Sequence, residues 1–418
     1  MPTTEPRTPT AFRAGQARER GPHARIRRVV KALTGTDLFP SPAITDAFAA
    51  GLSTGDPIAE RFVRETYHGG LGARKSRELL ERALTSSIDD VPEAPESMRA
   101  LFEDFERLPG WVDPGLVEEG AAVWRRWGYA LGAVGNAGTM DTYTEAALAL
   151  PLSLSGGYAG SRALHRYLET THWWIEVCRP GAILTPGSLA REISLKVRVM
   201  HVSVRARVAE HPEWERERWG LPISQSHMLL TLLGGSIAPA FALHVVGHVT
   251  TPREMRAVLH FNRYCGHLAG VRADGYFPET ALEAWRILFL CDAARAHDSG
   301  ALGRELVESF VPSFAPLPRH RGFQKLRAAY HFRVQAGYSG LFMLPWHRRR
   351  YRMPSPLPGI VFLLLRAPLI LTLELLRRLS PRVDRWWQTW SLRGWDRWYR
   401  WQSAGRAAEF DAARELRR

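Results

Sequence analysis

A stretch of 34 residues, 219–252, contains no acid, lysine or arginine, and this feature constrains the fold more than any other. A charge-free run of this length is stable only away from water, either across a membrane or inside a protein core. A membrane span needs about 20 consecutive apolar residues, whereas this run is interrupted by glycines at 234–235, by Pro239 and by His244 and His248. The sequence therefore predicts two buried helices here.

The spacing of apolar residues elsewhere also predicts helices. Within 193–208, apolar residues recur at steps of three and four, which is the period of one face of an α-helix. No segment competes with this pattern as a strand, because Gly and Pro clusters come at intervals of one or two helices. Residues 96–108 and 118–129 are predicted as surface helices with aromatic inner faces. The predicted fold class is all-α, and 418 residues with 45% hydrophobic content suffice for a large core.

One histidine, His201, lies on the apolar stripe of the helix at 193–208. An imidazole among valines is either a core histidine whose nitrogens have protein partners, or a ligand of a metal or haem iron. Arg198 and Arg205 lie on the same helix at three and four residues from this histidine. Guanidinium groups match the geometry of carboxylates, including haem propionates. Both arginines are therefore candidate cofactor-binding residues.

Three segments together resemble a known family. They read Arg166-Tyr-Leu-Glu169-Thr170, Arg198-Val-Met-His201-Val-Ser-Val-Arg205 and Leu221-Pro-Ile-Ser-Gln up to Thr231. With the sequence that follows, up to residue 271, they resemble the MpaB oxygenase family, which includes the latex-clearing rubber oxygenases. The resemblance implies a globin-like helical bundle around a pocket that holds haem b non-covalently, with dioxygen bound at a His-ligated iron.

The resemblance also implies roles for individual residues. His201 corresponds to the proximal iron ligand, Arg166 and Thr170 to distal-side residues, and Thr231 to a pocket residue. Arg166 and Thr170 are four residues apart and share a helix face. There they could place a cation and a hydroxyl where negative charge develops on oxygen. Arg166 reads equally well as a surface arginine or a propionate partner.

The sequence departs from the rubber oxygenases next to the distal threonine. Those enzymes are expected to have a lysine there, and this chain has Glu169. The carboxylate could act as a general base, or lie on a solvated helix face. We therefore expect an oxygenase acting on an apolar, isoprenoid or lipid-like substrate, rather than identical chemistry on polyisoprene. The alternatives are a haem-binding carrier or gas sensor without turnover, and a structural, membrane-associated helical bundle.

Other potential ligands carry weaker signals. The three cysteines, Cys178, Cys265 and Cys291, are far apart and indicate neither a disulfide framework nor covalent haem attachment. Cys178 as an axial thiolate is a minor alternative. The pair His244 and His248 could face together as metal ligands, but a third ligand is not apparent.

The last 73 residues, 346–418, differ from the rest of the chain. They contain sixteen arginines and six acids, so they carry +10 of the formal net charge of +14. An aliphatic run at 357–376 precedes tryptophans interspersed with arginines at 385–401. Such side chains are typical of a lipid headgroup boundary, which predicts peripheral membrane contact. Packing of the run on the core is the alternative, and nucleic acid is not expected because it would leave the aliphatic run unused.

The domain boundaries follow from composition. Residues 1–28 contain hardly any large apolar residue, so we expect them to be disordered. They lack the hydrophobic part of a secretion signal, which predicts a cytoplasmic protein, peripheral on the inner face of the cell membrane. Residues 29–345 are predicted to form the helical, haem-binding, oxygenase-like domain. Residues 346–418 form the basic, Trp-rich helical extension.

Overall fold

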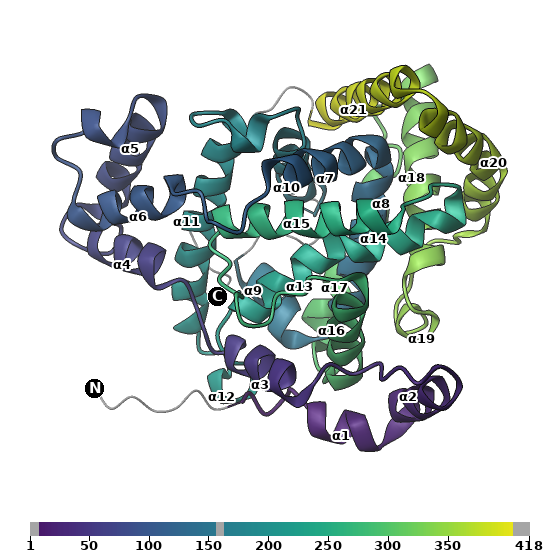
Figure 1. Ribbon diagram of the computed structural model, residues 1–418, viewed down its shortest axis with the longest axis horizontal. Helices are drawn as coiled ribbons and strands as arrows, with labels where there is room; N and C mark the ends of the chain where they lie inside the picture. The colour runs from purple at the N-terminus through teal and green to yellow at the C-terminus, as the bar shows by residue number, and fades with distance from the viewer. Residues whose placement is uncertain (1–7, 156–162, 404–418) are drawn as a thin grey trace.

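The computed structural model describes residues 8–155 and 163–403, and these form helices without any strand (Figure 1). The all-α prediction is confirmed. The helices before residue 110 are α1 Ala14–Glu19, α2 Gly21–Thr34, α3 Pro42–Gly51, α4 Pro57–Thr66, α5 Gly72–Thr85, η1 Ile88–Asp90 and α6 Glu96–Glu106.

The middle of the chain supplies the helices of the core. They are α7 Pro114–Trp127, α8 Tyr129–Thr142, α9 Ala146–Leu154, α10 Ala163–Val177, η3 Ala182–Leu184, α11 Leu189–Ala209, α12 Arg216–Trp219, α13 Gln225–Gly235, α14 Ile237–Ala242, η4 Leu243–Val246 and α15 Pro252–Leu268. The remaining helices are α16 Ala281–Ala294, α17 Gly300–Phe310, η5 Val311–Phe314, α18 Gly322–Phe342, α19 Pro345–Arg348, α20 Leu357–Leu379 and α21 Pro381–Ser403.

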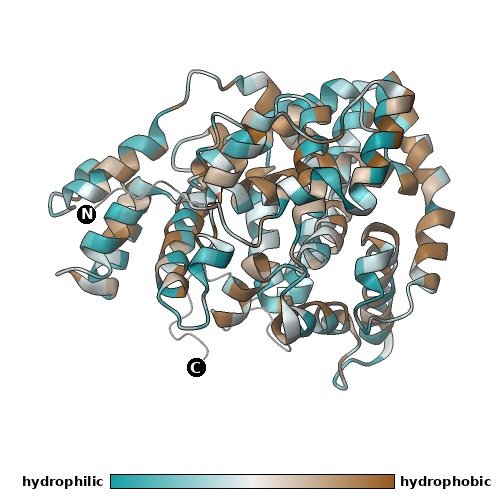
Figure 2. Ribbon diagram, turned by 90° about the horizontal axis from the view of Figure 1, so that it is seen from below, coloured by the Kyte–Doolittle hydropathy of each residue, from teal (hydrophilic) through white to brown (hydrophobic). Residues whose placement is uncertain are grey.

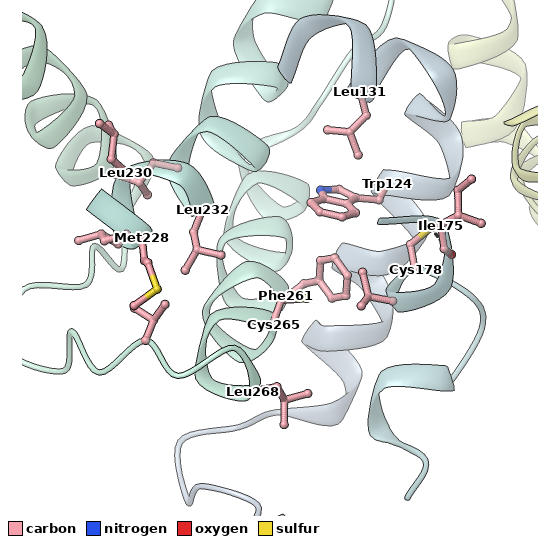
Figure 3. Packing of buried hydrophobic residues seen from close by; sticks show 14 of the residues in the cluster. Trp124, Leu131, Ile175, Cys178, Met228, Leu230, Leu232, Phe261, Cys265 and Leu268 are labelled. Atoms are coloured by element: carbon pink, nitrogen blue, oxygen red, sulfur yellow. Dashed lines mark hydrogen bonds between the residues drawn. The ribbon is translucent and has the colours of Figure 1, made fainter. Parts of the chain in front are cut away.

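The most extensive contact between two helices joins α7 to α15. Gly120 of α7 lies against the backbone of α15, where a Cβ atom would come within 2.3 Å of the Ala257 carbonyl oxygen. One turn later Trp124 packs edge-on against Phe261, with ring centroids 5.1 Å apart (Figure 3). Its indole nitrogen donates a hydrogen bond to the Gly235 carbonyl (2.9 Å). Residues 118–129, predicted as a surface helix, therefore belong to the centre of the core.

The charge-free run folds as the sequence predicts, into α13, α14 and η4. Residues Gln225–Val246 are long and apolar enough to cross a membrane, yet 61% of their most apolar window is buried inside the fold. Leu357–Leu379 passes the same test and is only 17% buried. The first segment is a core element, and the second is an exposed apolar helix.

The structure differs from the expectation of disorder near the amino terminus. Residues 1–7 lie outside the described part, but α1 and the first half of α2 lie within 1–28. Ala14 and Ala17 pack in a small cluster with Phe39, and Arg18 donates to the Pro40 carbonyl (2.6 Å). Small side chains and long-range polar contacts stabilise these helices in place of large apolar residues.

The carboxy-terminal extension packs on the main body. Leu363 of α20 and Trp395 of α21 belong to the large hydrophobic cluster, and buried Trp387 donates to the Arg126 carbonyl (3.0 Å). His347 lies 3.0 Å from the Asp141 carboxylate of α8. The inner sides of these helices therefore share the core with residues 29–345.

Candidate functional site

His201 occupies the middle of α11, a helix whose first turn is capped by Ser188. The Ser188 hydroxyl accepts a hydrogen bond from the Arg191 amide (3.3 Å). The imidazole is partly buried, and its Nδ1 is shielded from solvent with no hydrogen-bond partner among the described residues. Burial, with a smaller contribution from the Arg205 charge, lowers the pKa of His201 to about 4. At neutral pH the side chain is therefore an uncharged imidazole with an unused nitrogen.

A short connection that contains η3 joins α10 to α11, and α11 packs against α10. A hydrogen bond from Trp173 Nε1 to Ser194 Oγ (2.9 Å) fixes the register of the two helices. Seven residues are close to two turns of an α-helix. Arg166 precedes Trp173 by seven residues and His201 follows Ser194 by seven. Arg166 and His201 therefore occupy equivalent helical positions, about two turns from this hydrogen bond, on the same sides of α10 and α11 as Trp173 and Ser194.

Thr170 lies one turn after Arg166, nearer the connection, and Val197 lies one turn before His201. These two residues are partly exposed, and so are Arg166 and His201. By contrast Tyr167 and Leu168 of α10, and Val199 and Val202 of α11, are buried. These four side chains of α10 and α11 are therefore only partly covered by the rest of the protein.

Arg166, Glu169 and Thr170 form a local cluster on α10. Arg166 Nη1 donates to Glu169 Oε2 (2.8 Å), and the other carboxylate oxygen of Glu169 lies 3.5 Å from His165 Nε2. The Thr170 hydroxyl donates to the Arg166 carbonyl (3.4 Å). Glu169 is buried, so it lies on no solvated helix face, and its contact with Arg166 orients the guanidinium.

Thr231 lies apart from this cluster. It is exposed, although almost every other residue of α13 is buried, and its hydroxyl donates to the His227 carbonyl one turn earlier (3.1 Å). In the described part of the chain no hydrogen bond joins it to Arg166, Thr170 or His201. Its role as a pocket residue stays a prediction.

Arg198 and Arg205 bind groups of the protein itself. Buried Arg198 forms a two-point ion pair with Asp56 (2.7 and 3.0 Å) and a second pair with Asp104 (2.8 Å). Arg205 donates to Glu60 (3.0 Å) and to the carbonyls of Pro222 and Ile223. These contacts give both arginines a structural role, and their predicted role in cofactor binding remains a prediction.

The weaker ligand candidates are placed as follows. Burial raises the pKa of Cys178 to about 12, so its side chain stays a thiol and donates to the Ile175 carbonyl (3.3 Å). All three cysteines are free and buried. His244 is exposed, whereas His248 is buried beside Glu374 (3.4 Å), so the two histidines do not share one environment.

One polar cluster has ligand-like composition that sequence spacing did not reveal. Carboxylate and imidazole atoms of Asp141, Asp292 and His347 lie within 4.8 Å of one another. Arg295 is placed among them, 3.4 Å from each aspartate and 3.3 Å from the imidazole. The guanidinium already supplies the positive charge that a metal ion would bring. The cluster therefore joins the carboxy-terminal extension to the core.

A second group of polar residues that the sequence did not single out lies behind α10. The Gln335 amide donates to the Tyr129 hydroxyl (3.0 Å), and the Asn136 amide donates to Gln335 (3.5 Å). Tyr167 adjoins this group, and burial raises the pKa of its hydroxyl to about 12. These residues come from α8, α10 and α18, so no local sequence pattern unites them. Through Tyr167 this group contacts α10.

Comparison with known proteins agrees with this architecture. Residues 121–368 match the catalytic domain described for the ER-bound oxygenase mpaB/B' and rubber oxygenase. A rubber oxygenase of Streptomyces sp. (strain K30) is 25% identical over 191 residues, which cover 44% of this chain and 46% of that protein. The chain thus matches about half the length of this relative.

A solved structure shows the same fold. The latex clearing protein LCP in its closed state matches with a TM-score of 0.63 and 18% identity, over 90% of this chain and 100% of that one. The family match spans more than half of the chain and includes α10, α11 and α13. Together with the resemblance of the three sequence segments, it shows that this chain belongs to the mpaB and rubber oxygenase family.

Proposed function

We propose that this protein is a haem-dependent oxygenase that acts on an apolar, isoprenoid or lipid-like substrate at the facing sides of α10 and α11. The observation that carries the proposal is the His201 imidazole, which is uncharged at neutral pH and has an unused Nδ1, on the helix that packs against the Arg166 helix. Iron ligation by histidine requires a neutral imidazole with a free nitrogen. The residues therefore fit the cofactor that the family resemblance implies.

Each residue of the proposed site would have its own role. His201 would hold the iron, and the bound haem would supply the redox chemistry with dioxygen. Arg166 would present a permanent cation to negative charge that develops at the facing side, and Thr170 would present a hydroxyl. Glu169 would hold the guanidinium in place through its 2.8 Å contact, and would accept a proton when a substrate delivers one.

The experiment is to purify the chain from cells supplied with a haem precursor and to record absorbance spectra, oxidised and reduced. We expect a Soret band at about one haem per chain, and its loss in His201→Ala. His331→Ala is the matched control, because burial also lowers the pKa of His331 to about 4 and its Nδ1 is likewise unpartnered. That histidine lies in α18, so the control should retain haem.

Oxygen uptake with a polyisoprenoid probe then separates an oxygenase from a haem protein without turnover. Substrate-dependent uptake by the wild type supports the oxygenase. A protein that holds haem through His201 but consumes no oxygen with such probes would be a carrier or sensor. A colourless wild-type protein that takes up no added haem would refute the proposal.

A further inference from the structure

The outer side of α20 is an exposed apolar surface. Leu365 is 77% exposed and Leu369 is 61% exposed, and Figure 2 shows hydrophobic residues along the helix at the edge of the fold. Large apolar surfaces of this kind mark interaction sites. The exposed large apolar residues of the helix are Leu357, Val361, Phe362, Leu364, Leu365, Leu369, Leu371, Leu375, Leu376 and Leu379.

The acids of α20 and α21 all bind the body of the protein. Glu374 contacts His248 (3.4 Å), Asp384 contacts Arg126 (3.2 Å) and Asp396 contacts Arg179 (2.9 Å). No other acid occurs in these two helices. The negative charges of α20 and α21 are thus neutralised on the side of these helices that packs against the body of the protein.

The arginines are distributed in the opposite way. Six of them are exposed, and in the described part of the chain none has an ion pair with a carboxylate: Arg378, Arg382, Arg385, Arg393, Arg397 and Arg400. The outward side of α20 and α21, which we call the outer face, therefore combines aliphatic side chains with cations alone.

The outer face also contains a groove of about 540 Å³ on α21. Trp386 and Trp390 line one part of it, with stacked rings 6.1 Å apart. Arg393, Arg397 and Arg400 line the rest. Indole rings and guanidinium groups side by side suit a ligand with an anionic head and an apolar body.

We propose that the outer face docks on the surface of an anionic phospholipid bilayer, with the arginines at the phosphates and the α20 leucines at the acyl boundary. Basic residues near an anionic surface, with apolar residues beside them, are the features of an interfacial helix. The docking is independent of the proposed function.

Two features favour a bilayer surface over other occupants. A symmetric contact with a second copy would place the same arginines against each other, and like charges oppose that contact. A single-stranded nucleic acid would neutralise the arginines but leave the leucines in water.

Helix α20 lies on the surface and does not cross the bilayer, because its Glu374 and Arg377 are buried in ion pairs that reach Glu254 of α15 (2.9 Å).

Docking also fixes what comes near the bilayer. Helix α10 packs against α21 through His172, which stacks on Tyr399 with ring centroids 5.1 Å apart, and Arg179, just after α10, pairs with Asp396 (2.9 Å). Helix α10, which contains Arg166, therefore lies directly beneath α21, one of the two helices of the outer face. If the proposed function holds, a membrane-dissolved substrate would have a short path to the site.

The experiment is flotation of the full-length chain with vesicles of pure phosphatidylcholine and vesicles that also contain phosphatidylglycerol. We expect binding only to the anionic vesicles, and a loss of binding as salt screens the charges. Arg393→Gln/Arg397→Gln should weaken the partition coefficient roughly 25-fold, on the basis of about fivefold for each arginine at an anionic surface. Leu365→Asn/Leu369→Asn should weaken it roughly tenfold or more.

Matched variants elsewhere on the surface test the specificity. Arg74→Gln/Lys75→Gln removes two charges from exposed positions of α5, and Val29→Asn/Leu33→Asn removes two exposed apolar residues from α2. Both should float like the wild type. The proposal is overturned if the outer-face variants float as well as these controls. It is also overturned if the wild type binds oligo-dT or forms dimers while leaving anionic vesicles unbound.

Discussion

Arg166 of α10 and His201 of α11 each lie seven residues, about two helical turns, from the hydrogen bond between Trp173 and Ser194 that joins their helices. Sequence spacing alone does not associate these two residues, because 34 residues lie between them. The proposed site joins these two residues, a permanent cation and an uncharged imidazole.

Replacement of Arg166 tests this pairing. Arg166→Gln should lower substrate-dependent oxygen uptake per haem roughly 100-fold, which is the effect of removing one preorganised donor from a site where charge develops. Haem content should stay near that of the wild type. Arg61→Gln is the control, because Arg61 is likewise partly buried and forms an ion pair of similar length with Glu65 (2.9 Å) within α4. Equal losses in both variants would remove the special role of Arg166.

Much of the fold follows from local patterns. The charge-free run, the helical stripe around His201 and the capping residues Ser188 and Thr251 all have direct counterparts in the helices. Thr251 and Glu254 form a complete capping box at the start of α15, with Pro252 at the first helical position. Signals of this kind depend on neighbours within four residues, so a single sequence contains them in full.

Partners far apart in the chain leave no such signal. The aspartates that bind Arg198 lie 142 and 94 residues away, and Arg126 of α7 is buried because Glu254, 128 residues away, pairs with it (2.7 Å). Charged residues of this kind made α7 read as a surface helix. The position of Thr231 relative to His201 depends equally on packing between helices, which spacing along the chain does not encode.

The contact between α7 and α15 gives a stability prediction. Gly120→Ala should destabilise the fold by about 2 kcal/mol, because the new Cβ would approach the Ala257 carbonyl and force the helices apart. Gly138→Ala in α8 is the matched control, since nothing lies within 4 Å of its Cβ position. It should stabilise the helix by about 0.5–1 kcal/mol. Urea unfolding of both variants measures the difference, and a neutral Gly120→Ala would show that the helices can separate freely.

The buried ion pairs of Arg198 give a second stability prediction, which separates a structural from a cofactor-binding role. Arg198→Gln leaves Asp56 and Asp104 buried without their cation and should destabilise the haem-free protein by about 3 kcal/mol. The pKa of Asp104, which burial raises but Arg198 and Arg272 lower below its ordinary value, should rise. The measurement is chemical unfolding of both proteins without haem. If Arg198 served only the cofactor, the substitution would leave the free energy of unfolding of the haem-free protein unchanged.

Buried histidines make the fold sensitive to acid. Burial lowers the pKa of His227 from 6.5 to about 4. The unfolded chain therefore binds a proton at this histidine below pH 6.5, whereas the folded chain binds it only below about pH 4. The stability that His227 contributes is fully present above pH 6.5 and is lost as the pH falls toward 4. Between pH 7.5 and pH 5 the loss amounts to about 2 kcal/mol.

The measurement is urea unfolding at pH 7.5 and at pH 5, for the wild type and for His227→Gln, whose side chain cannot be protonated. The difference in free energy of unfolding between the two pH values should be smaller in the variant by about 2 kcal/mol. His331 of α18, also buried and with a pKa lowered by burial to about 4, offers an independent repeat. The two effects should add in the double variant, because distant sites contribute separately. An unchanged pH dependence in both variants would mean that these imidazoles are solvated in the folded protein.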